Sequence, residues 1–210
     1  MVGTGTPSIS ESITLTQIAD ELGFKVALVL PPFYYKPIEN DGLFLWYKNL
    51  HEALGDRKIK IYFYNFPQMT GLTIPIEVIE KLHNQWPKRF GGIKDSSGDL
   101  NYCRMLSKNP NFKVFPSSEV SISEAYKSNF SGCISATVNQ TLHLSSEAWL
   151  HRSSNIEGLM SKISYLRDTI SKKSLIPSIK FLVSVRTNDN IWNNLLPPFA
   201  NLTAQRQTEL

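Results

Sequence analysis

Two side chains in the middle of the chain have the types and spacing for carbon–carbon bond chemistry. Lys94 closes the run 90–93 and precedes a turn-forming segment, 95–99. A lysine at the end of a buried strand is partly desolvated, which favours the neutral amine that attacks a ketone to form an imine. Tyr64 ends an earlier strand-like run, and its hydroxyl can both donate and accept protons. Taken singly, Lys94 is more simply interpreted as a solvated lysine and Tyr64 as an aromatic residue at the rim. Whether they form a catalytic site depends on the elements around them.

The elements expected around these two residues alternate between strands and helices. Short runs rich in Val, Ile and aromatic residues predict strands at 26–30, 59–64, 91–94, 113–116 and 132–136, with part of a sixth at 1–6. Stretches between them predict helices at 10–22, 42–54, 75–86, 100–107 and 120–128. This alternation indicates βα units and a parallel sheet. Ligands bind at the carboxyl ends of such strands, where Lys94 and Tyr64 are expected to lie.

The last third of the chain has a different pattern. After Asn139, helices alone are predicted, at 145–153, 156–171 and 179–185. We therefore divide the chain into a strand-containing part, 1–144, and a helical part, 145–210. Parallel βα repeats form either an open doubly wound sheet or a closed eight-stranded barrel, and strand count alone does not distinguish the two.

Composition narrows the class of protein. The chain has 210 residues, of which 41% are hydrophobic and 19% are charged, as is typical of a globular domain. The net charge of +4 is spread along the sequence, and its densest basic pair, Lys172-Lys173, falls in a predicted helix, so nucleic-acid binding is not favoured. No leader-like segment and no apolar window near ~20 residues is present, so we expect a cytoplasmic protein without a membrane partner. Cys103 and Cys133 predict neither a disulfide framework nor a zinc site.

Five motifs follow one another in a fixed order along the chain. They are Pro32-Phe33-Tyr34-Tyr35-Lys36-Pro37, Tyr64-Asn65-Phe66-Pro67 with Thr70-Gly71, Gly92-Ile93-Lys94-Asp95-Ser96-Ser97-Gly98-Asp99, Gly132-Cys133-Ile134-Ser135-Ala136-Thr137-Val138-Asn139, and Leu196-Pro197-Pro198-Phe199. Together they resemble the dihydrodipicolinate synthase / N-acetylneuraminate lyase family of Schiff-base-forming 2-oxo-acid aldolases. The combination is far more specific than any one of its pieces, and it spans nearly the whole chain.

The resemblance implies a fold and an activity. The fold is a (β/α)8 barrel with C-terminal helices, usually a homotetramer, and the substrate is a 2-oxo acid such as pyruvate, handled without a metal or an organic cofactor. By this resemblance Lys94 forms the imine, Tyr64 transfers protons, and Tyr34 reaches into the site of a neighbouring subunit. The backbone around Ile134 would line the pyruvyl pocket. The protonated imine is the electron sink that allows the carbon–carbon bond to break or form.

Two departures from the family's pattern bear on the substrate. Dihydrodipicolinate synthases carry an arginine in the loop where this chain has Met69, and a thioether cannot hold a substrate carboxylate. A sugar-acid or 4-hydroxy-2-oxo-acid aldolase therefore fits better. Ser118 and Glu119 could contact substrate hydroxyls, although a helix-capping serine followed by a first-turn glutamate explains them equally well.

The third departure is at the front of the chain. The family begins with strands 1 and 2, which carry its carboxylate-binding motif, whereas residues 1–6 resemble only the end of strand 3. The expected fold is thus a barrel lacking strands 1, 2 and most of 3, with exposed sheet edges that favour oligomers, low solubility and slow turnover. Two alternatives stay open: an inactive truncated family member acting as a binding or assembly protein, and an open doubly wound binding domain.

Overall fold

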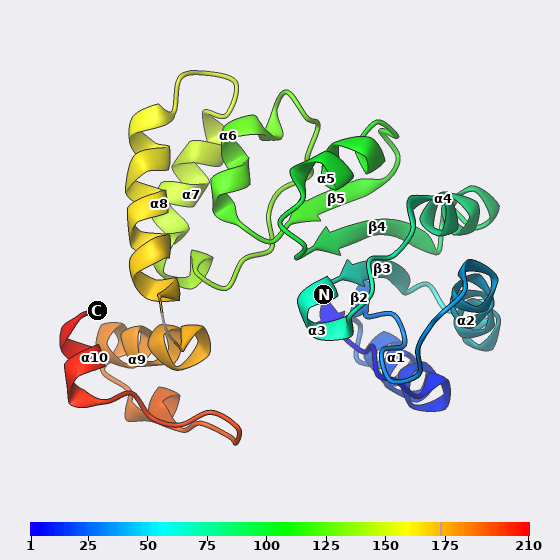
Figure 1. Ribbon diagram of the computed structural model, residues 1–210, viewed down its shortest axis with the longest axis horizontal. Helices are drawn as coiled ribbons and strands as arrows, with labels where there is room; N and C mark the ends of the chain where they lie inside the picture. The colour runs from blue at the N-terminus through cyan, green and yellow to red at the C-terminus, as the bar shows by residue number, and fades with distance from the viewer. Residues whose placement is uncertain (173) are drawn as a thin grey trace. The chain divides into compact units, whose positions relative to one another are not determined.

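The computed structural model describes residues 1–172 and 174–210, so Lys173 of the predicted basic pair lies outside the described residues. The chain forms two compact units, shown in Figure 1: residues 1–116 with 128–131, and residues 117–127 with 132–210. These two units are not the two parts predicted from the sequence, 1–144 and 145–210, which separate a barrel from a helical appendage. That division stays a prediction.

The first unit contains a parallel sheet whose strand order follows the chain. Its strands, among the described residues, are β1 (Val2–Gly3), β2 (Val26–Val29), β3 (Lys60–Asn65), β4 (Phe90–Asp95) and β5 (Lys113–Pro116). Every neighbouring pair is parallel. A doubly wound sheet reverses its strand order at a switch point, and this unit does not. The order is that of a barrel segment, and the doubly wound alternative does not fit it.

Helices connect these strands and cover one face of the sheet. They are α1 (Ile9–Glu21), α2 (Asn40–Leu54), α4 (Ile76–Gln85) and α5 (Leu100–Leu106), with a single-turn helix α3 (Pro67–Thr70) after β3 (Figure 1). The predicted N-cap Asp99 is confirmed, because its carboxylate accepts hydrogen bonds from the amides of Asn101 and Tyr102. Helix α3 was not predicted, since four residues carry no periodic pattern.

Side chains of the central strands alternate between two faces. Phe63 is fully buried on the helix-covered face, where it stacks on Phe90 with ring centroids 5.4 Å apart and meets Tyr47 of α2 edge-on at 4.9 Å. Asn65, two residues along β3, is also fully buried. Because strand side chains alternate, Tyr64 faces the other side of the sheet. The strand β3 thus directs the half-buried Tyr64 away from the helices.

The strand predicted at 132–136 is wrong. Residues 132–136 belong to no strand, and the helix α7 (Val138–Leu150) begins directly after them. Backbone groups of a strand need a ladder of partners, but the hydrogen bonding beside β5 ends with a single bond, from the Ser131 amide to the Val114 carbonyl, 2.9 Å. The apolar composition of residues 132–136 predicts burial, but it does not supply the hydrogen-bond partners that a strand requires.

The second unit is helical in its described residues. It contains a 3-10 turn η1 (Glu119–Ser121), α6 (Ile122–Ala125), α7, α8 (Glu157–Ser171), α9 (Leu175–Thr187), η2 (Asn190–Asn193) and α10 (Ala204–Thr208). Its main core joins Ile122, Ala148, Ile156 and Ile163. The helix predicted at 156–171 is confirmed; the one predicted at 145–153 begins seven residues earlier, and the one at 120–128 is only η1 and α6. No helix in the described part of the chain has both the length and the apolar character to cross a bilayer.

Candidate active site

Lys94 and Tyr64 are direct neighbours at the carboxyl ends of β4 and β3. The two strands pair in a register that sets Tyr64 opposite Lys94. The Lys94 Nζ donates a hydrogen bond to the Tyr64 Oη, 2.9 Å away, and lies 4.2 Å from the centre of the phenol ring. Both side chains are half-buried. The sheet thus brings together the amine and the hydroxyl that the sequence analysis singled out.

This geometry suits proton transfer at an amine that reacts with a carbonyl. The Tyr64 hydroxyl lies within hydrogen-bonding distance of the Lys94 nitrogen, the position from which a general acid or base acts. The ring also offers its π face to the ammonium. An imine formed between a ketone and Nζ would therefore lie beside a group able to move protons to and from it.

The residues that follow this pair form a buried lock on the opposite face of the sheet. The Asn65 Nδ2 donates to the Asp95 Oδ1 at 2.7 Å, and the Asn65 Oδ1 accepts from the Ile74 amide at 3.0 Å. The Ser97 Oγ donates to the other Asp95 oxygen at 2.8 Å. Both Asn65 and Asp95 are almost fully buried. The lock fixes the ends of β3 and β4, and hence the relative position of Tyr64 and Lys94.

The replacement Asn65→Ala is expected to lower the free energy of unfolding by about 2–3 kcal/mol. It leaves the buried Oδ1 of Asp95 and the buried amide of Ile74 without their partner, although Ser97 still donates to the other Asp95 oxygen. Unsatisfied buried groups cost about 1–3 kcal/mol. Urea unfolding followed by circular dichroism measures the change. The exposed Asn84→Ala is the control and should change stability by less than about 0.5 kcal/mol. Equal effects of the two replacements would show that the lock carries no stability.

Below the pair, the inner face of the sheet carries aromatic rings. Tyr62 and Phe115 stack with centroids 6.0 Å apart. A Cβ at Gly92 would lie 3.0 Å from the Tyr62 ring and would collide with the Lys113 carbonyl, so no larger residue fits there. Burial raises the pKa of Tyr62. Its hydroxyl therefore stays protonated at neutral pH, so Tyr62 adds no negative charge to this face.

Tyr34 lies apart from the pair, in the segment that follows β2. Its side chain is 75% exposed and meets the ring of Tyr35 edge-on at 5.1 Å. Its described contacts do not include Lys94 or Tyr64. In the same segment the Lys36 ammonium occupies the space that a side chain at position 71 would need, and Gly71, at the end of α3, has a positive φ of +63°. Two exposed tyrosines on one loop are free to meet another molecule.

Ser118, Glu119 and Ile134 belong to the second unit. The Ser118 hydroxyl caps η1 by accepting from the Val120 amide. Glu119 is fully buried, and its carboxylate accepts hydrogen bonds from Ser135 and Thr137 at 2.6 Å, from Thr141 at 3.0 Å and from Arg167 at 2.9 Å. A direct contact with substrate would require one of these bonds to open, and the substrate-binding role of Glu119 stays a prediction.

The charges in this cluster influence one another. Burial alone would raise the pKa of the Glu119 carboxyl, but hydrogen bonds from Ser135 and Thr137 and the charge of Arg167 outweigh burial and lower it. Burial and the neighbouring Glu119 raise the pKa of the Cys133 thiol to about 11. At neutral pH, Glu119 is therefore ionised, and Cys133 is an unreactive thiol. The cluster ties η1, residues 135–137, α7 and α8 together.

The replacement Glu119→Gln is expected to destabilise the second unit at pH 7 and to have a smaller effect in acid. The folded-state pKa of Glu119 lies below 4.5, so its ionised form stabilises the protein above that pH, and this stabilisation is lost as the pH falls through the folded value. We expect a loss of about 3 kcal/mol at pH 7, as for breaking a buried ion pair. Urea unfolding at about pH 7 and at about pH 3.5 measures the change in the free energy of unfolding under each condition.

The exposed Glu147→Gln is the control for this replacement, because Glu147 lies on α7 in the same unit. Its effect on the free energy of unfolding should be small at both pH values. A Glu119→Gln effect that stays constant between the two would mean that ionisation of Glu119 contributes nothing to stability.

Comparison with known proteins places this geometry in a family. A family model described as the dihydrodipicolinate synthetase family matches residues 1–210. An uncharacterised DapA-like lyase from Chloroflexus aurantiacus is 28% identical over 203 residues, which is 95% of this chain and 65% of the relative. The chain therefore spans about two thirds of the length of this relative.

The chain belongs to the dihydrodipicolinate synthetase family.

Solved structures of similar fold agree with this membership. The dihydrodipicolinate synthase from Agrobacterium tumefaciens superposes with a TM-score of 0.84 at 26% identity, over 99% of this chain and 71% of that one. A Sulfolobus 2-keto-3-deoxygluconate aldolase superposes equally well, with a TM-score of 0.84 over 99% of this chain and 69% of that one. At 18% identity the second likeness concerns the fold alone. The resemblance inferred from the five motifs is confirmed.

Several residues with buried polar contacts inside one or the other unit were not singled out from the sequence. Asn65 and Asp95 were part of the quoted motifs, and their positions one residue beyond Tyr64 and Lys94 on paired strands could have revealed the lock. Arg167 lies far along the chain from Glu119, and no local signal connects them. Among the described residues no cluster of three or more His, Cys, Asp or Glu side chains is placed to hold a metal ion.

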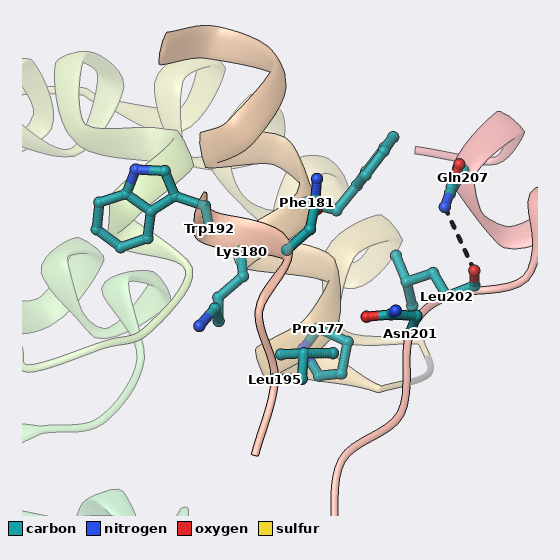
Figure 2. A pocket seen from close by; sticks show the side chains of 9 residues that line it. Pro177, Lys180, Phe181, Trp192, Leu195, Asn201, Leu202 and Gln207 are labelled. Carbon is teal, nitrogen blue, oxygen red and sulfur yellow. Dashed lines mark hydrogen bonds between the residues drawn. The ribbon is translucent and has the colours of Figure 1, made fainter. Parts of the chain in front are cut away.

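The second unit also contains a small cavity, shown in Figure 2. It has a volume of about 190 Å³ and lies among Pro177, Phe181, Trp192, Leu195 and Leu202. The Gln207 amide closes one side by donating to the Leu202 carbonyl at 3.3 Å. This volume is below the ~300 Å³ at which ligand pockets begin. We assign no ligand to it.

Proposed function

We propose that this protein is a carbon–carbon lyase that forms a Schiff base with a pyruvate-type 2-oxo acid, with Lys94 as the nucleophile. The observation that supports this most strongly is the 2.9 Å hydrogen bond between Lys94 Nζ and Tyr64 Oη at the carboxyl ends of adjacent parallel strands. Membership of a family that includes named lyases and aldolases supports it further.

The steps of the proposed reaction follow from these two groups. The neutral Lys94 amine attacks C2 of the 2-oxo acid, and loss of water gives a protonated imine. In the cleavage direction the bond between C3 and C4 breaks, its electron pair moves into the imine as an enamine, and the C4 hydroxyl loses its proton to leave an aldehyde. Tyr64 carries protons to and from the reacting atoms. Protonation of the enamine and hydrolysis then release pyruvate and regenerate Lys94. In this proposal the imine takes the part that a metal or an organic cofactor would otherwise play.

The proposed substrate is a sugar acid or another 4-hydroxy-2-oxo acid rather than the substrate of dihydrodipicolinate synthase. Met69 is 70% exposed on α3, where the family's synthases carry an arginine, and it offers no charge for a second carboxylate. Ile134 would contribute backbone to the pyruvyl pocket, and Ser118 and Glu119 would contact substrate hydroxyls. The buried bonds of Glu119 would in addition hold Ser135 next to Ile134.

The proposed architecture is a (β/α)8 barrel that assembles as a homo-oligomer, as a tetramer by resemblance. The sequential parallel order of the sheet supports a barrel. In the assembly Tyr34, 75% exposed here, would reach the site of a neighbouring subunit.

An enzyme-coupled assay for released pyruvate tests the proposed function. The protein is incubated separately with 2-keto-3-deoxygluconate and with a simple 4-hydroxy-2-oxo acid, and condensation of pyruvate with aspartate semialdehyde is measured in parallel. We expect pyruvate release from at least one hydroxy-oxo acid and little condensation with the semialdehyde. An imine that forms without turnover of any of these compounds would contradict the lyase function and favour a binding protein.

A further inference from the structure

A large cavity lies in the first unit at the amino ends of β3 and β4, whereas Lys94 and Tyr64 lie at the carboxyl ends of these strands. Its volume is about 750 Å³, within the ~300–1,000 Å³ range of ligand pockets. Helices α2 and α4 pack side by side (Figure 1). They end at Leu54 and Gln85, and most of the lining residues lie in the turns that follow them. The cavity is therefore built from turns that the proposed lyase chemistry does not use.

The lining of this cavity is strongly basic. Five of its ten residues are Lys or Arg, and the single acidic one is Asp56. Arg57 pairs with Asp20 and Glu21 outside the cavity. For Lys58, Lys60 and Lys88, which are exposed, no carboxylate partner occurs among the described ion pairs. Three such lysines around one concavity attract an anion.

A buried arginine shapes the floor of the cavity. Arg89 is 7% exposed, and its guanidinium donates to the carbonyls of Gly55 at 2.9 Å, Arg57 at 2.8 Å and Ile59, and to the His51 ring at 3.3 Å. Through these bonds Arg89 holds residues 55–59 in place. The carbonyls at the end of α2 offset part of the positive charge of the guanidinium. None of them is a carboxylate. Burial lowers the pKa of Arg89, and a bound anion would relieve that penalty.

Two rings supply a flat wall and a neutral donor. Trp86 is half-buried and lines the cavity, with its centroid 4.6 Å from that of His51. Burial and the neighbouring Arg89 lower the pKa of His51, so its ring is neutral at pH 7. Because the Nδ1 of His51 accepts from Arg89, its proton resides on Nε2, which is then a donor. An indole ring beside cationic groups suits a ligand that combines a flat, uncharged ring with a separate negatively charged group.

We propose that this cavity binds an organic phosphate with a flat ring, such as a nucleoside monophosphate. The lysines Lys58, Lys60 and Lys88 hold the phosphate, and Trp86 stacks against the ring. The proposal goes beyond the lyase function and does not depend on it, because neither Lys94 nor Tyr64 lines the cavity.

Isothermal titration calorimetry of the full chain with adenosine monophosphate tests the proposal. We expect saturable binding that the double replacement Lys58→Glu with Lys88→Glu weakens on the order of tenfold or more. The matched control reverses two exposed lysines of the second unit, Lys127→Glu with Lys162→Glu, and should leave affinity within about twofold. Absence of binding at millimolar ligand, or equal loss in both double variants, would overturn the proposal.

A second comparison separates the ring from the phosphate. Trp86→Leu should weaken adenosine monophosphate several-fold and leave inorganic phosphate unchanged, with circular dichroism to verify that the variant folds. Inorganic phosphate that binds the original protein as tightly as the nucleotide would contradict a site for a ring-bearing ligand. Binding that persists in Lys94→Ala supports this location, and binding abolished by that replacement places the nucleotide elsewhere and overturns it.

Discussion

Replacing Lys94 with alanine is expected to abolish turnover. The proposed reaction passes through a covalent imine on Nζ, and no other amine of the described structure contacts Tyr64. Removal of a covalent nucleophile lowers turnover on the order of 10⁴-fold or more. The lost hydrogen bond is half-buried, so the fold should persist. The measurement is the rate of pyruvate release at saturating substrate, accompanied by a thermal melt.

Two further replacements separate covalent chemistry from charge. Lys94→Arg keeps a cation beside the phenol ring, but a guanidinium stays protonated and is not a nucleophile, so it should be as inactive as Lys94→Ala. Lys25→Ala removes an exposed lysine near β2 and should leave turnover unchanged. An active Lys94→Arg variant would show that the site needs only a positive charge, and it would remove the imine from the mechanism.

The second large effect is expected from Tyr64→Phe. This replacement deletes the hydroxyl that lies 2.9 Å from Nζ and keeps the ring that stacks near Phe66. Loss of one general acid–base group lowers turnover by about 10²- to 10⁴-fold, and we expect the lower end because Lys94 remains in place. The fall should appear in kcat rather than in KM, since proton transfer and not substrate binding is impaired.

The exposed Tyr165→Phe is the control for this change, since it deletes a phenol hydroxyl far along the chain on α8. The Tyr64→Phe protein should still form the imine with pyruvate, only more slowly. Turnover equal to that of the original protein would show that Tyr64 is a rim aromatic without a part in the chemistry.

The proximity of Lys94 and Tyr64 could be predicted from the sequence for a physical reason, and the family resemblance pointed to the same two residues. Lys94 and Tyr64 each end a run whose apolar residues fix the strand and its burial, and paired parallel strands bring such ends together. The strands β2 to β5 and most helices of the first unit were predicted within about two residues, because each carries its own periodic pattern.

Predictions failed where structure depends on distant partners. The segment 132–136 reads as a strand, but strand formation needs a ladder that local sequence does not reveal. The early start of α7 is equally non-local, because Thr141 turns inward to bond the buried Glu119 instead of facing water as its polarity indicates. The contacts of Arg89, about which the sequence made no prediction, also join segments about thirty residues apart, and no local pattern reveals them.

Imine formation by Lys94 is tested most directly by the peptide mass spectrum of the protein after incubation with pyruvate and borohydride. Borohydride reduces an imine to a stable secondary amine, so the reacting lysine keeps the pyruvyl carbon skeleton through digestion. We expect one reduced pyruvyl group on the peptide that contains Lys94, and none in Lys94→Ala protein treated identically. An unmodified Lys94, or a label that persists in the Lys94→Ala protein, would contradict it.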